Sequence, residues 1–267
     1  MLVVCATPIG NLEDVTLRVL AELRAADVVL CEDTRHTRGL LERHGVEAKL
    51  VSYHEHNEAA RTDELLPRLV AGERIALVSD AGMPGVSDPG ARIVRAALDA
   101  GVPVTVLPGP SAVETALVAS GFAGGAFQFL GFLPRGARAL DALWPTLSLV
   151  SVAFDSPQRL PATLASLAAF DASREVAVCR ELTKKFEEVV RGTASEAAAR
   201  FAKPPKGEIT LVVGAPAASA SASGSDNAEA LAAVAELVAA GMPRKRAAEL
   251  VSSLTGVSRN TLYRGSL

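Results

Sequence analysis

The residues from Arg74 to Gly90, RIALVSDAGMPGVSDPG, join a short apolar run to a loop rich in glycine and proline. The apolar run ends on Ser79 and Asp80, and the loop after them contains three glycines and two prolines. Glycine lets a ligand approach the backbone, proline stiffens the loop, and the Asp80 carboxylate can accept hydrogen bonds. Ligands of open α/β sheets bind outside the carboxyl ends of the strands, so the stretch predicts a ligand-binding loop or an ordinary strand-to-helix turn. Pro89 and ARIVRAALDAG then predict a helix with Asp88 as its N-cap.

The first expected strand, residues 2–6, runs directly into TPIGNL. Dinucleotide-binding folds carry the pattern G-x-G-x-x-G at this position, but only Gly10 is present, so a pyrophosphate-cradling loop is not expected. Thr7, Pro8 and Gly10 instead predict either the wall of a pocket for a ligand without phosphate or a plain tight turn.

Charged and polar side chains also follow the second and third expected strands. Glu32, Asp33 and Arg35 form a mixed-charge cluster, which is either part of a binding site or a surface ion-pair group. His54 and Asn57, in the segment HEHN, are expected to hydrogen-bond a polar substrate. We expect no metal here, because an H-x-H pair needs a third ligand and the sequence supplies none at a recognisable spacing.

Two further segments carry groups that could bind a charged ligand. Pro108, Gly109 and Ser111 precede an expected helix, whose free N–H groups would suit the carboxylate of an amino-acid-like ligand. The segment 180–187, RELTKKFE, follows an expected buried strand and holds charges of both signs. A capped linker and a solvated face are the structural alternatives for these two segments.

Apolar strands alternate with helical segments in the first part of the chain, which predicts an α/β fold with a mostly parallel sheet covered on both faces. The strands are expected at residues 2–6, 27–31, 49–52, 74–79 and 103–107. Helices are expected between them, at residues 15–25, 36–44 and 58–71. A second series of strands predicts a second α/β domain with a mixed sheet, at about 127–133, 148–154, 175–181, 187–191 and 208–214.

The predicted organisation is therefore an N-terminal α/β domain over residues 1–109 and a second α/β domain over residues 110–214, with a ligand cleft between them. Helices at about 157–169 and 194–202 separate only some of the later strands. Residues 215–227 are rich in serine and alanine and predict a flexible linker.

Residues 228–267 predict a small C-terminal helical segment of helix-turn-helix character. Its last two helices carry five cationic residues, among them Arg244, Lys245 and Arg246, against one acidic residue. This local excess predicts nucleic-acid contact, although the whole chain has a net charge of −3.

The 267-residue chain is 49% hydrophobic and only 4% aromatic, so its core is expected to be aliphatic. Cys5, Cys31 and Cys179 each lie in an apolar run and predict reduced, buried thiols. No segment resembles a membrane span or a secretory signal, so we expect a cytoplasmic protein without a membrane partner.

Eight segments occur in the same order as in one known family: TPIGNLEDVT, EDTRHT, HEHNE, ALVSDAGMPGVSDPG, LPGPSAVETAL, GFLPR, RELTKKFEEVVRGT and KGEITLVV. On these segments essentially the whole chain resembles the tetrapyrrole (corrin/porphyrin) methylase superfamily. Within it, TPIGNL and EDTR are typical of the branch that 2′-O-methylates a cytidine ribose in the decoding region of 16S rRNA. The resemblance implies a two-domain methylase fold, S-adenosylmethionine as methyl donor, the 30S ribosomal subunit as partner and a homodimer.

The resemblance also implies roles for individual residues. The implied donor pocket contains Pro8, Asp80, Ala81, Gly82, Pro108, Gly109 and Ser111, and Thr7 and Gly10 are expected beside them. The residues implied to face the RNA ribose are Glu32, Asp33, Arg35, His54, Asn57 and Lys184. For the chemistry, we expect Lys184 either as a neutral base or as a cation that stabilises an alkoxide, and Asp33, next to Glu32, as a proton acceptor.

The chain departs from the family pattern at three places. Met83 replaces a hydroxyl residue, which removes one hydrogen bond to the donor. The segment 136–144 is short and has one arginine, so more of the RNA contact is expected from residues 244–246. Phe154 and Asp155 stand where the family usually has a Tyr-Glu pair.

Two other functions remain open for the same residues. The first is methylation of a small tetrapyrrole or another small molecule, against which the glycine-poor first loop and the basic C-terminal segment argue. The second is a nucleic-acid-binding regulator whose two α/β domains sense the donor. The acidic net charge of the chain argues against this function.

Overall fold

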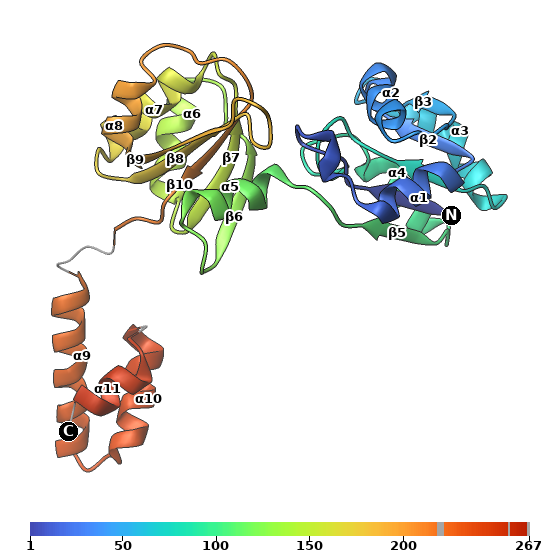
Figure 1. The fold of residues 1–267 in the computed structure, drawn as a ribbon. Coiled ribbons are helices and arrows are strands. Elements are labelled where there is room, and N and C mark those ends of the chain that lie inside the picture. The colour runs from blue at the N-terminus through green and yellow to red at the C-terminus, as the bar shows by residue number, and fades with distance from the viewer. Residues whose placement is uncertain (218–221, 256, 266–267) are drawn as a thin grey trace. The chain divides into compact units, whose positions relative to one another are not determined.

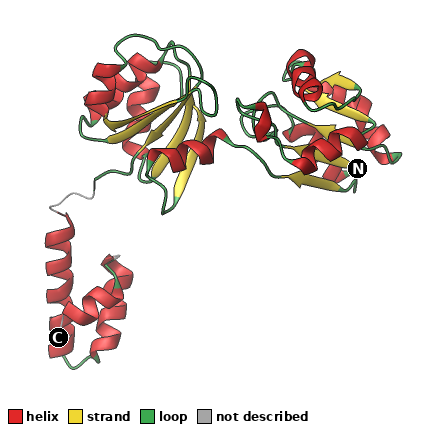
Figure 2. Cartoon of the chain, in the orientation of Figure 1, coloured by secondary structure: helices red, strands yellow, loops and turns green. Residues whose placement is uncertain are grey.

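The structure, a computed structural model, describes residues 1–217, 222–255 and 257–265 (Figure 1). Residue contacts divide the chain into two units, Met1–Ala215 and Pro216–Leu267. The larger unit contains two five-stranded sheets with their helices, and the described part of the smaller unit is helical (Figure 2).

The first sheet is parallel throughout, with strand order β3-β2-β4-β1-β5. Its strands are β1 (Leu2–Cys5), β2 (Val28–Cys31), β3 (Leu50–Ser52), β4 (Ile75–Leu77) and β5 (Val104–Leu107). The helices that connect them are α1 (Leu17–Ala25), α2 (Thr34–Arg43), α3 (Glu58–Val70) and α4 (Ala91–Asp99). The expected parallel sheet is confirmed.

Both faces of this sheet are buried against helices. Alternate residues of its short strands point to opposite sides, so each strand contributes apolar side chains to both faces. Val3, Val29 and Ala76 belong to a cluster with the apolar residues of α1 and α2. Leu30 and Leu77 point the other way, into a cluster with the apolar residues of α3 and α4. The carboxyl ends of the strands are thereby held by packing on two sides.

The second sheet is mixed, as expected, with strand order β6-β7-β10-β8-β9 and one parallel pair, β6 with β7. Its strands are β6 (Phe127–Phe132), β7 (Val150–Asp155), β8 (Glu175–Arg180), β9 (Glu188–Thr193) and β10 (Ile209–Val213). Its helices are α5 (Ala112–Ser120), α6 (Ala137–Leu143), α7 (Leu160–Phe170) and α8 (Ala194–Arg200). Short 3₁₀ turns lie at Leu12–Asp14 and Trp144–Thr146.

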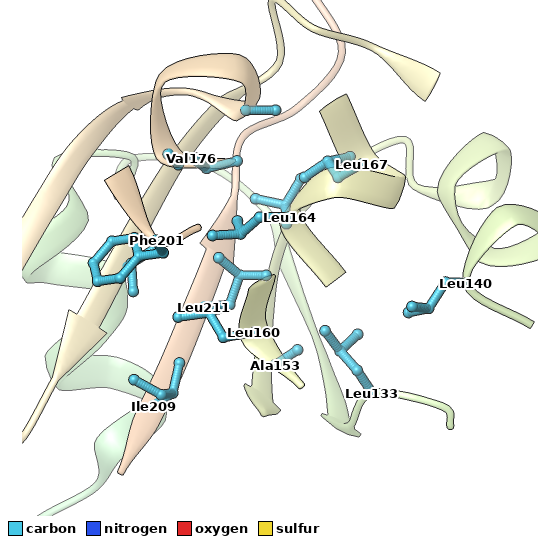
Figure 3. Packing of buried hydrophobic residues seen from close by; sticks show 14 of the residues in the cluster. Leu133, Leu140, Ala153, Leu160, Leu164, Leu167, Val176, Phe201, Ile209 and Leu211 are labelled. Atoms are coloured by element: carbon cyan, nitrogen blue, oxygen red, sulfur yellow. The ribbon is translucent and has the colours of Figure 1, made fainter. Parts of the chain in front are cut away.

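The core of the second sheet is mainly aliphatic on the face covered by α6, α7 and α8, with Phe201 and Trp144 as its aromatic members (Figure 3). Leu164 of α7 is fully buried there, in one cluster with Leu160, Leu167 and Leu211. On the other face, Val113, Ala116 and Leu117 of α5 pack against strand residues that include Cys179.

Truncation of Leu164 to alanine is expected to lower the free energy of unfolding by about 2–5 kcal/mol, because it leaves a cavity in a closed core. Chemical denaturation measures this loss. Leu17→Ala is the matched control, since the Leu17 side chain is 84% exposed and its loss should change stability by less than about 0.5 kcal/mol. Equal losses in the two variants would contradict the packing of α7.

The expected N-cap of the helix after the glycine-rich loop is wrong. Helix α4 begins at Ala91 with Gly90 as N-cap, and Val94 N–H donates to the Gly90 carbonyl. Gly90 has a φ of 140°, and a Cβ there would lie 2.9 Å from Leu77, so only glycine fits where the chain turns into the helix. The Asp88 side chain is thereby free of the helix, and the Ser79 hydroxyl lowers the pKa of Asp88.

The smaller unit contains α9 (Ala222–Ala239), α10 (Arg244–Thr255) and α11 (Arg259–Gly265). Its core includes Val234, Ala247, Val251 and Leu262, contributed by all three helices. The expected linker over residues 215–227 is too long, because α9 begins within it: alanine has the highest helix propensity and extends the helix into this serine-rich stretch. Residues 218–221 of that linker lie outside the described residues.

The three thiols are free and buried, as expected for reduced structural cysteines. Burial raises the pKa of Cys5 to about 12 and that of Cys179 to about 11, which keeps both protonated and unreactive. Across the described ranges, no helix combines the length and the apolarity needed to cross a membrane.

Candidate active site

A cavity of about 1140 Å³ lies in the larger unit, between loops of the first sheet and strands of the second. The loop after β4 contributes residues from Ala81 to Asp88, and the segment after β5 contributes Pro108 to Thr115. The second sheet contributes a mainly apolar wall, which includes Phe127, Phe129, Phe132, Phe154 and Leu182. A mostly apolar cavity with a few polar groups is typical of a small-molecule site.

The two loops of the first sheet are held by hydrogen bonds and close packing. Thr7 and Gly82 exchange two backbone hydrogen bonds of 2.9 and 3.1 Å, and the Thr7 hydroxyl donates to the Ser79 carbonyl at 2.9 Å. A Cβ on Gly109 would lie 3.0 Å from the Cβ of Ala6, so glycine lets the segment after β5 pass close to the end of β1. Thr7 is therefore a brace behind the cavity.

Helix α5 begins at the cavity wall and offers free backbone donors there. Ser111 is its N-cap residue but makes no side-chain capping bond, since its hydroxyl donates to the Glu114 carboxylate instead. The N–H groups of the first turn have no carbonyl partner within the helix. The geometry suits an anionic group such as a carboxylate.

Three carboxylates gather where β2 and β4 end. Burial, and then the charge of Asp80, raise the pKa of Glu32. Burial, and then the charge of Glu32, raise the pKa of Asp88 to about 6. Asp80 is fixed in this group because its carboxylate accepts the Asp33 N–H at 3.1 Å. The site therefore contains one carboxyl group, Asp88, that exchanges its proton close to neutral pH.

Asp33 is held in a different way. It caps α2 by accepting the Arg35 N–H at 2.8 Å, and it also pairs with the Arg35 guanidinium at 2.7 Å. These hydrogen bonds hold the pKa of Asp33 well below its usual range. Asp33 therefore stays ionised and is a weaker proton acceptor than Glu32 or Asp88.

His54 and Asn57 form one turn after β3. The Asn57 side chain accepts the His54 N–H at 2.8 Å and lies 3.1 Å from His54 Nε2. Asn57 also donates to the Ser52 carbonyl at 3.3 Å. The His54 Nδ1 is buried and has no hydrogen-bond partner among the described residues. Asn57 thus fixes the ring of His54 near Glu32, and His54 lowers the pKa of Glu32.

Lys184 lies in the loop between β8 and β9 and is clamped by two carboxylates. Its ammonium group donates to Glu208 at 2.9 Å and to Glu181 at 3.1 Å. Burial lowers the pKa of Lys184, but the two hydrogen-bonded carboxylates outweigh burial and raise it above its usual value. Gly207 allows this clamp, since a Cβ there would lie 2.4 Å from the Glu181 side chain. Lys184 is therefore a cation, and the neutral-base alternative is disfavoured.

The loop that carries Lys184 packs directly on the loop after β1. The Asn11 N–H donates to the Thr183 hydroxyl at 3.0 Å. A Cβ on Gly10 would lie 2.5 Å from Lys184 Cγ and 2.8 Å from the Leu182 carbonyl. Gly10 therefore has a role that the sequence analysis missed: it lets the two loops meet and fixes the position of Lys184.

Within the described ranges, the non-glycine residues with positive φ lie in loops around the cavity. The non-glycine residues with positive φ in the described ranges are Ser87, Glu181 and Thr183, with φ of 65°, 53° and 64°. Ser87 borders the cavity, and the other two flank Leu182, which also lines it. Such conformations cost about 1–3 kcal/mol each and concentrate at functional sites.

Two of the residues that depart from the family pattern, Met83 and Asp155, have packing roles in the structure. Met83 lines the cavity and packs on the core beside α3 and α4. Asp155 is buried and fully bonded: it pairs with Arg159 at 2.9 Å and accepts the Thr163 hydroxyl at 2.7 Å. Asp155 therefore holds α7 to β7.

The structure brings only part of the expected donor pocket together. The cavity is lined by Ala81, Gly82, Pro108, Gly109 and Ser111. Thr7, Pro8 and Asp80 instead line a separate cavity of about 10 Å³, which is too small for a donor. Lys184 reaches the main cavity through Glu208, and Glu32 lies beside Asp88.

Sequence reasoning missed Asp88, Glu208 and the aromatic wall. The signal for Asp88 was present in SDPG, but a helix cap explained it equally well. Glu208 stands directly before β10 and could be found only through its contact with Lys184. Among the described residues, no three His, Cys, Asp or Glu side chains are placed to hold a metal ion.

The basic residues of the smaller unit begin α10. Lys245 and Arg246 are exposed and Arg244 is half-buried. Cations at a helix N-terminus face the positive end of the helix dipole, so these three lower the stability of the helix unless an anion neutralises them. The arrangement is typical of a surface that contacts phosphate.

Comparison with known proteins agrees with this geometry. The family model described as Tetrapyrrole (Corrin/Porphyrin) Methylases matches residues 1–198, and the RsmI C-terminal HTH domain matches residues 224–265. The chain is 44% identical to the ribosomal RNA small subunit methyltransferase I of Mesorhizobium japonicum, over 97% of this chain and 88% of that protein. It is 46% identical to the Thermotoga maritima protein of the same name, over 79% of this chain and 97% of the relative.

Solved structures share the fold at lower identity. The uroporphyrin-III-C-methyltransferase of Thermus thermophilus superposes with a TM-score of 0.60 at 24% identity, covering 80% of this chain and 93% of that one. The methyltransferase CobJ superposes with a TM-score of 0.61 at 19% identity, covering 81% of this chain and 94% of that one.

Proposed function

The chain belongs to the tetrapyrrole methylase family and, within it, to the ribosomal RNA small subunit methyltransferase I group, and from this premise we propose that it methylates 16S rRNA. The proposed reaction is transfer of a methyl group from S-adenosylmethionine to the 2′-hydroxyl of a cytidine ribose in the decoding region. The observation that carries the proposal is the cavity flanked by a clamped lysine and by carboxylates with raised pKa.

The cavity suits S-adenosylmethionine in size and charge. Its volume of about 1140 Å³ slightly exceeds the usual range for small-molecule pockets. Its described lining includes carboxylates but neither lysine nor arginine, which favours a ligand with positive charge. The start of α5 would bind the donor carboxylate, and Ala81 and Gly82 would contact the donor through their backbone. When bound, the donor supplies a methyl group on a cationic sulfur.

This chain's own residues orient the hydroxyl and stabilise its charge. We assign Lys184 as a cation beside the ribose oxygen, where it stabilises the negative charge that develops as the hydroxyl loses its proton. Glu208 and Glu181 hold Lys184 in place. Asp33, Arg35, His54 and Asn57 form the RNA-facing edge, where Arg35 is 87% exposed and available to a phosphate.

The basic start of α10 is the proposed contact to the ribosomal subunit. Replacing Arg244, Lys245 and Arg246 together by alanine should weaken binding to the 30S subunit and reduce the salt dependence of that binding, because each lost phosphate contact releases one counterion fewer. Fluorescence titration at several salt concentrations measures both quantities. A charge-matched control replaces three exposed cations of the larger unit, Arg18, Arg95 and Lys203. If the control weakens binding as much, α10 is not the contact.

A homodimer in the cytoplasm is the proposed working form. Several large apolar side chains of the larger unit are exposed: Val106 (53%), Val118 (70%), Phe127 (39%) and Phe132 (61%). Val106, Phe127 and Phe132 lie on β5 and β6, which are edge strands of their sheets. Sedimentation of the purified chain tests the dimer, and a monomer at micromolar concentration would contradict it.

Label transfer from radioactive S-adenosylmethionine tests the function. Three acceptors separate the alternatives: 30S subunits that lack their native methyl groups, protein-free 16S rRNA and a small tetrapyrrole. Label in the 30S or 16S RNA supports the proposal. Label in the tetrapyrrole alone supports the small-molecule alternative, and donor binding without any label supports the sensor.

A further inference from the structure

We propose that Asp88 accepts the proton of the substrate hydroxyl during methyl transfer. The inference rests on the proposed function and adds the residue that the expected catalytic set lacks. Lys184 is held as a cation and has no lone pair to offer, and Asp33 is tied to Arg35. Glu32 also has a raised pKa but is not among the cavity-lining residues, whereas Asp88 is one of them.

Among the described residues, Asp88 has no cationic partner, unlike two of the three other carboxylates that line the cavity. Asp155 is paired with Arg159, and Glu208 with Lys184. Glu114 accepts the Ser111 hydroxyl at the first turn of α5. The negative charges of Glu32 and Asp80 both raise the pKa of Asp88, and the Ser79 hydroxyl only partly opposes them. It is the lining carboxylate whose charge is least neutralised by protein groups.

The loop holds this carboxylate at the cavity wall. Ser87, directly before Asp88, has a φ of 65°, and Gly85 and Gly90 on either side also have positive φ, at 82° and 140°. Ser87 packs on the second sheet, where its hydroxyl would lie 3.5 Å from a Cβ on Gly131 of β6. A strained loop that is braced on both sides presents Asp88 in one position, as a proton acceptor requires.

The reaction then balances without any further reagent. The ribose oxygen forms a bond to the methyl carbon, the carbon–sulfur bond breaks with its electron pair left on sulfur, and the hydroxyl proton passes to the Asp88 carboxylate. A cationic sulfur and a carboxylate become a neutral thioether and a neutral carboxylic acid. Asp88 afterwards loses the proton to water.

The electrostatics of the site match this task. Burial and the charges of Glu32 and Asp80 raise the pKa of Asp88 to about 6, while the Ser79 hydroxyl opposes the rise. At pH 7 and above Asp88 is therefore mostly ionised yet more basic than an ordinary aspartate. Below pH 6 it is protonated and cannot accept, so the rate should fall about tenfold per pH unit there.

The test is Asp88→Asn in the full-length chain, measured as single-turnover methyl transfer to 30S subunits across pH 5–8. We expect a rate about 10²–10⁴-fold lower, loss of the acidic limb near pH 6, and affinities for donor and subunit within about threefold of wild type. Asp99→Asn is the control, since Asp99 is exposed and paired with Arg95 at the end of α4. Carboxyl NMR of the free protein should show a resonance that titrates near pH 6 and is missing in Asp88→Asn.

Two results would overturn the inference while leaving methylation itself intact. One is an Asp88→Asn enzyme that retains its rate within a few-fold. The other is a variant that loses donor affinity but keeps its rate at saturating donor, which would make Asp88 a ligand for the cationic donor. If wild type itself transfers no methyl group, the proposed function fails instead.

Should Asp88→Asn not fold, Ser79→Ala replaces it. Loss of the Ser79 hydroxyl should shift the acidic limb of the pH–rate profile to higher pH, and an unmoved limb contradicts the proposal.

Discussion

Replacing Lys184 by methionine should lower the rate of methyl transfer by about 10²–10³-fold, the usual cost of removing one group that stabilises a developing oxyanion. The reason is geometric. Two carboxylates hold the Lys184 ammonium within 3.1 Å and keep it charged, and the loop that carries it is fixed against the loop after β1. Donor affinity should change by less than about threefold, because Lys184 is not part of the cavity lining.

Lys185→Met is the matched control for this variant. Lys185 is the next residue along the chain, but it is exposed and lies over the ring of Phe186. Rates are compared under single-turnover conditions, and donor affinity is measured by calorimetry. A Lys184→Met enzyme with a near-normal rate would make Lys184 a structural lysine, and equal losses in both variants would point to general electrostatics of the loop.

Gly10→Ala should lower the rate at least tenfold although it adds a single methyl group. A Cβ at Gly10 would overlap Lys184 Cγ and the Leu182 carbonyl, so the loop with Lys184 must move. Since a displacement of about 1 Å at the reacting groups can cost about 10²-fold, the effect on rate should exceed the effect on donor binding.

The control for Gly10 is Gly39→Ala. Gly39 lies in α2, and a Cβ there would meet nothing within 4 Å. The alanine should leave the rate unchanged and raise helix stability by about 0.5–1 kcal/mol. Thermal unfolding of both variants separates a loss of folding from a local shift, and a Gly10→Ala enzyme with normal rate would mean that the two loops need not meet.

Much of the fold could be predicted, because its short apolar strands are separated by segments whose apolar residues recur at helical spacing. Both sheets and the parallel-to-mixed change between them follow from that pattern. The resemblance added the donor and the RNA substrate. The N-cap of the helix after this loop was predicted wrongly. Asp88 in the D-P-G sequence suits an N-cap, but the helix begins at Ala91 with Gly90 as its N-cap.

The pairing of charges within the site could not be predicted from sequence. Glu208 is 24 residues from Lys184, and Asp80 is 47 residues from Asp33, yet both pairs are in hydrogen-bond contact. The contact with Glu208 helps to keep Lys184 a cation, and the contact with Asp33 fixes the Asp80 carboxylate in the site. Residue types and spacing alone therefore leave the proton acceptor open, and our proposal of Asp88 depends on the folded geometry.

The most direct test of the central claim is to find the methylated atom. Undermethylated 30S subunits are treated with the enzyme and isotope-labelled S-adenosylmethionine, and the 16S rRNA is digested and analysed by mass spectrometry. We expect one labelled nucleotide, a cytidine in the decoding region with the methyl group on its ribose oxygen. Label on a base, label spread over many nucleotides, or no label at all would contradict the assignment.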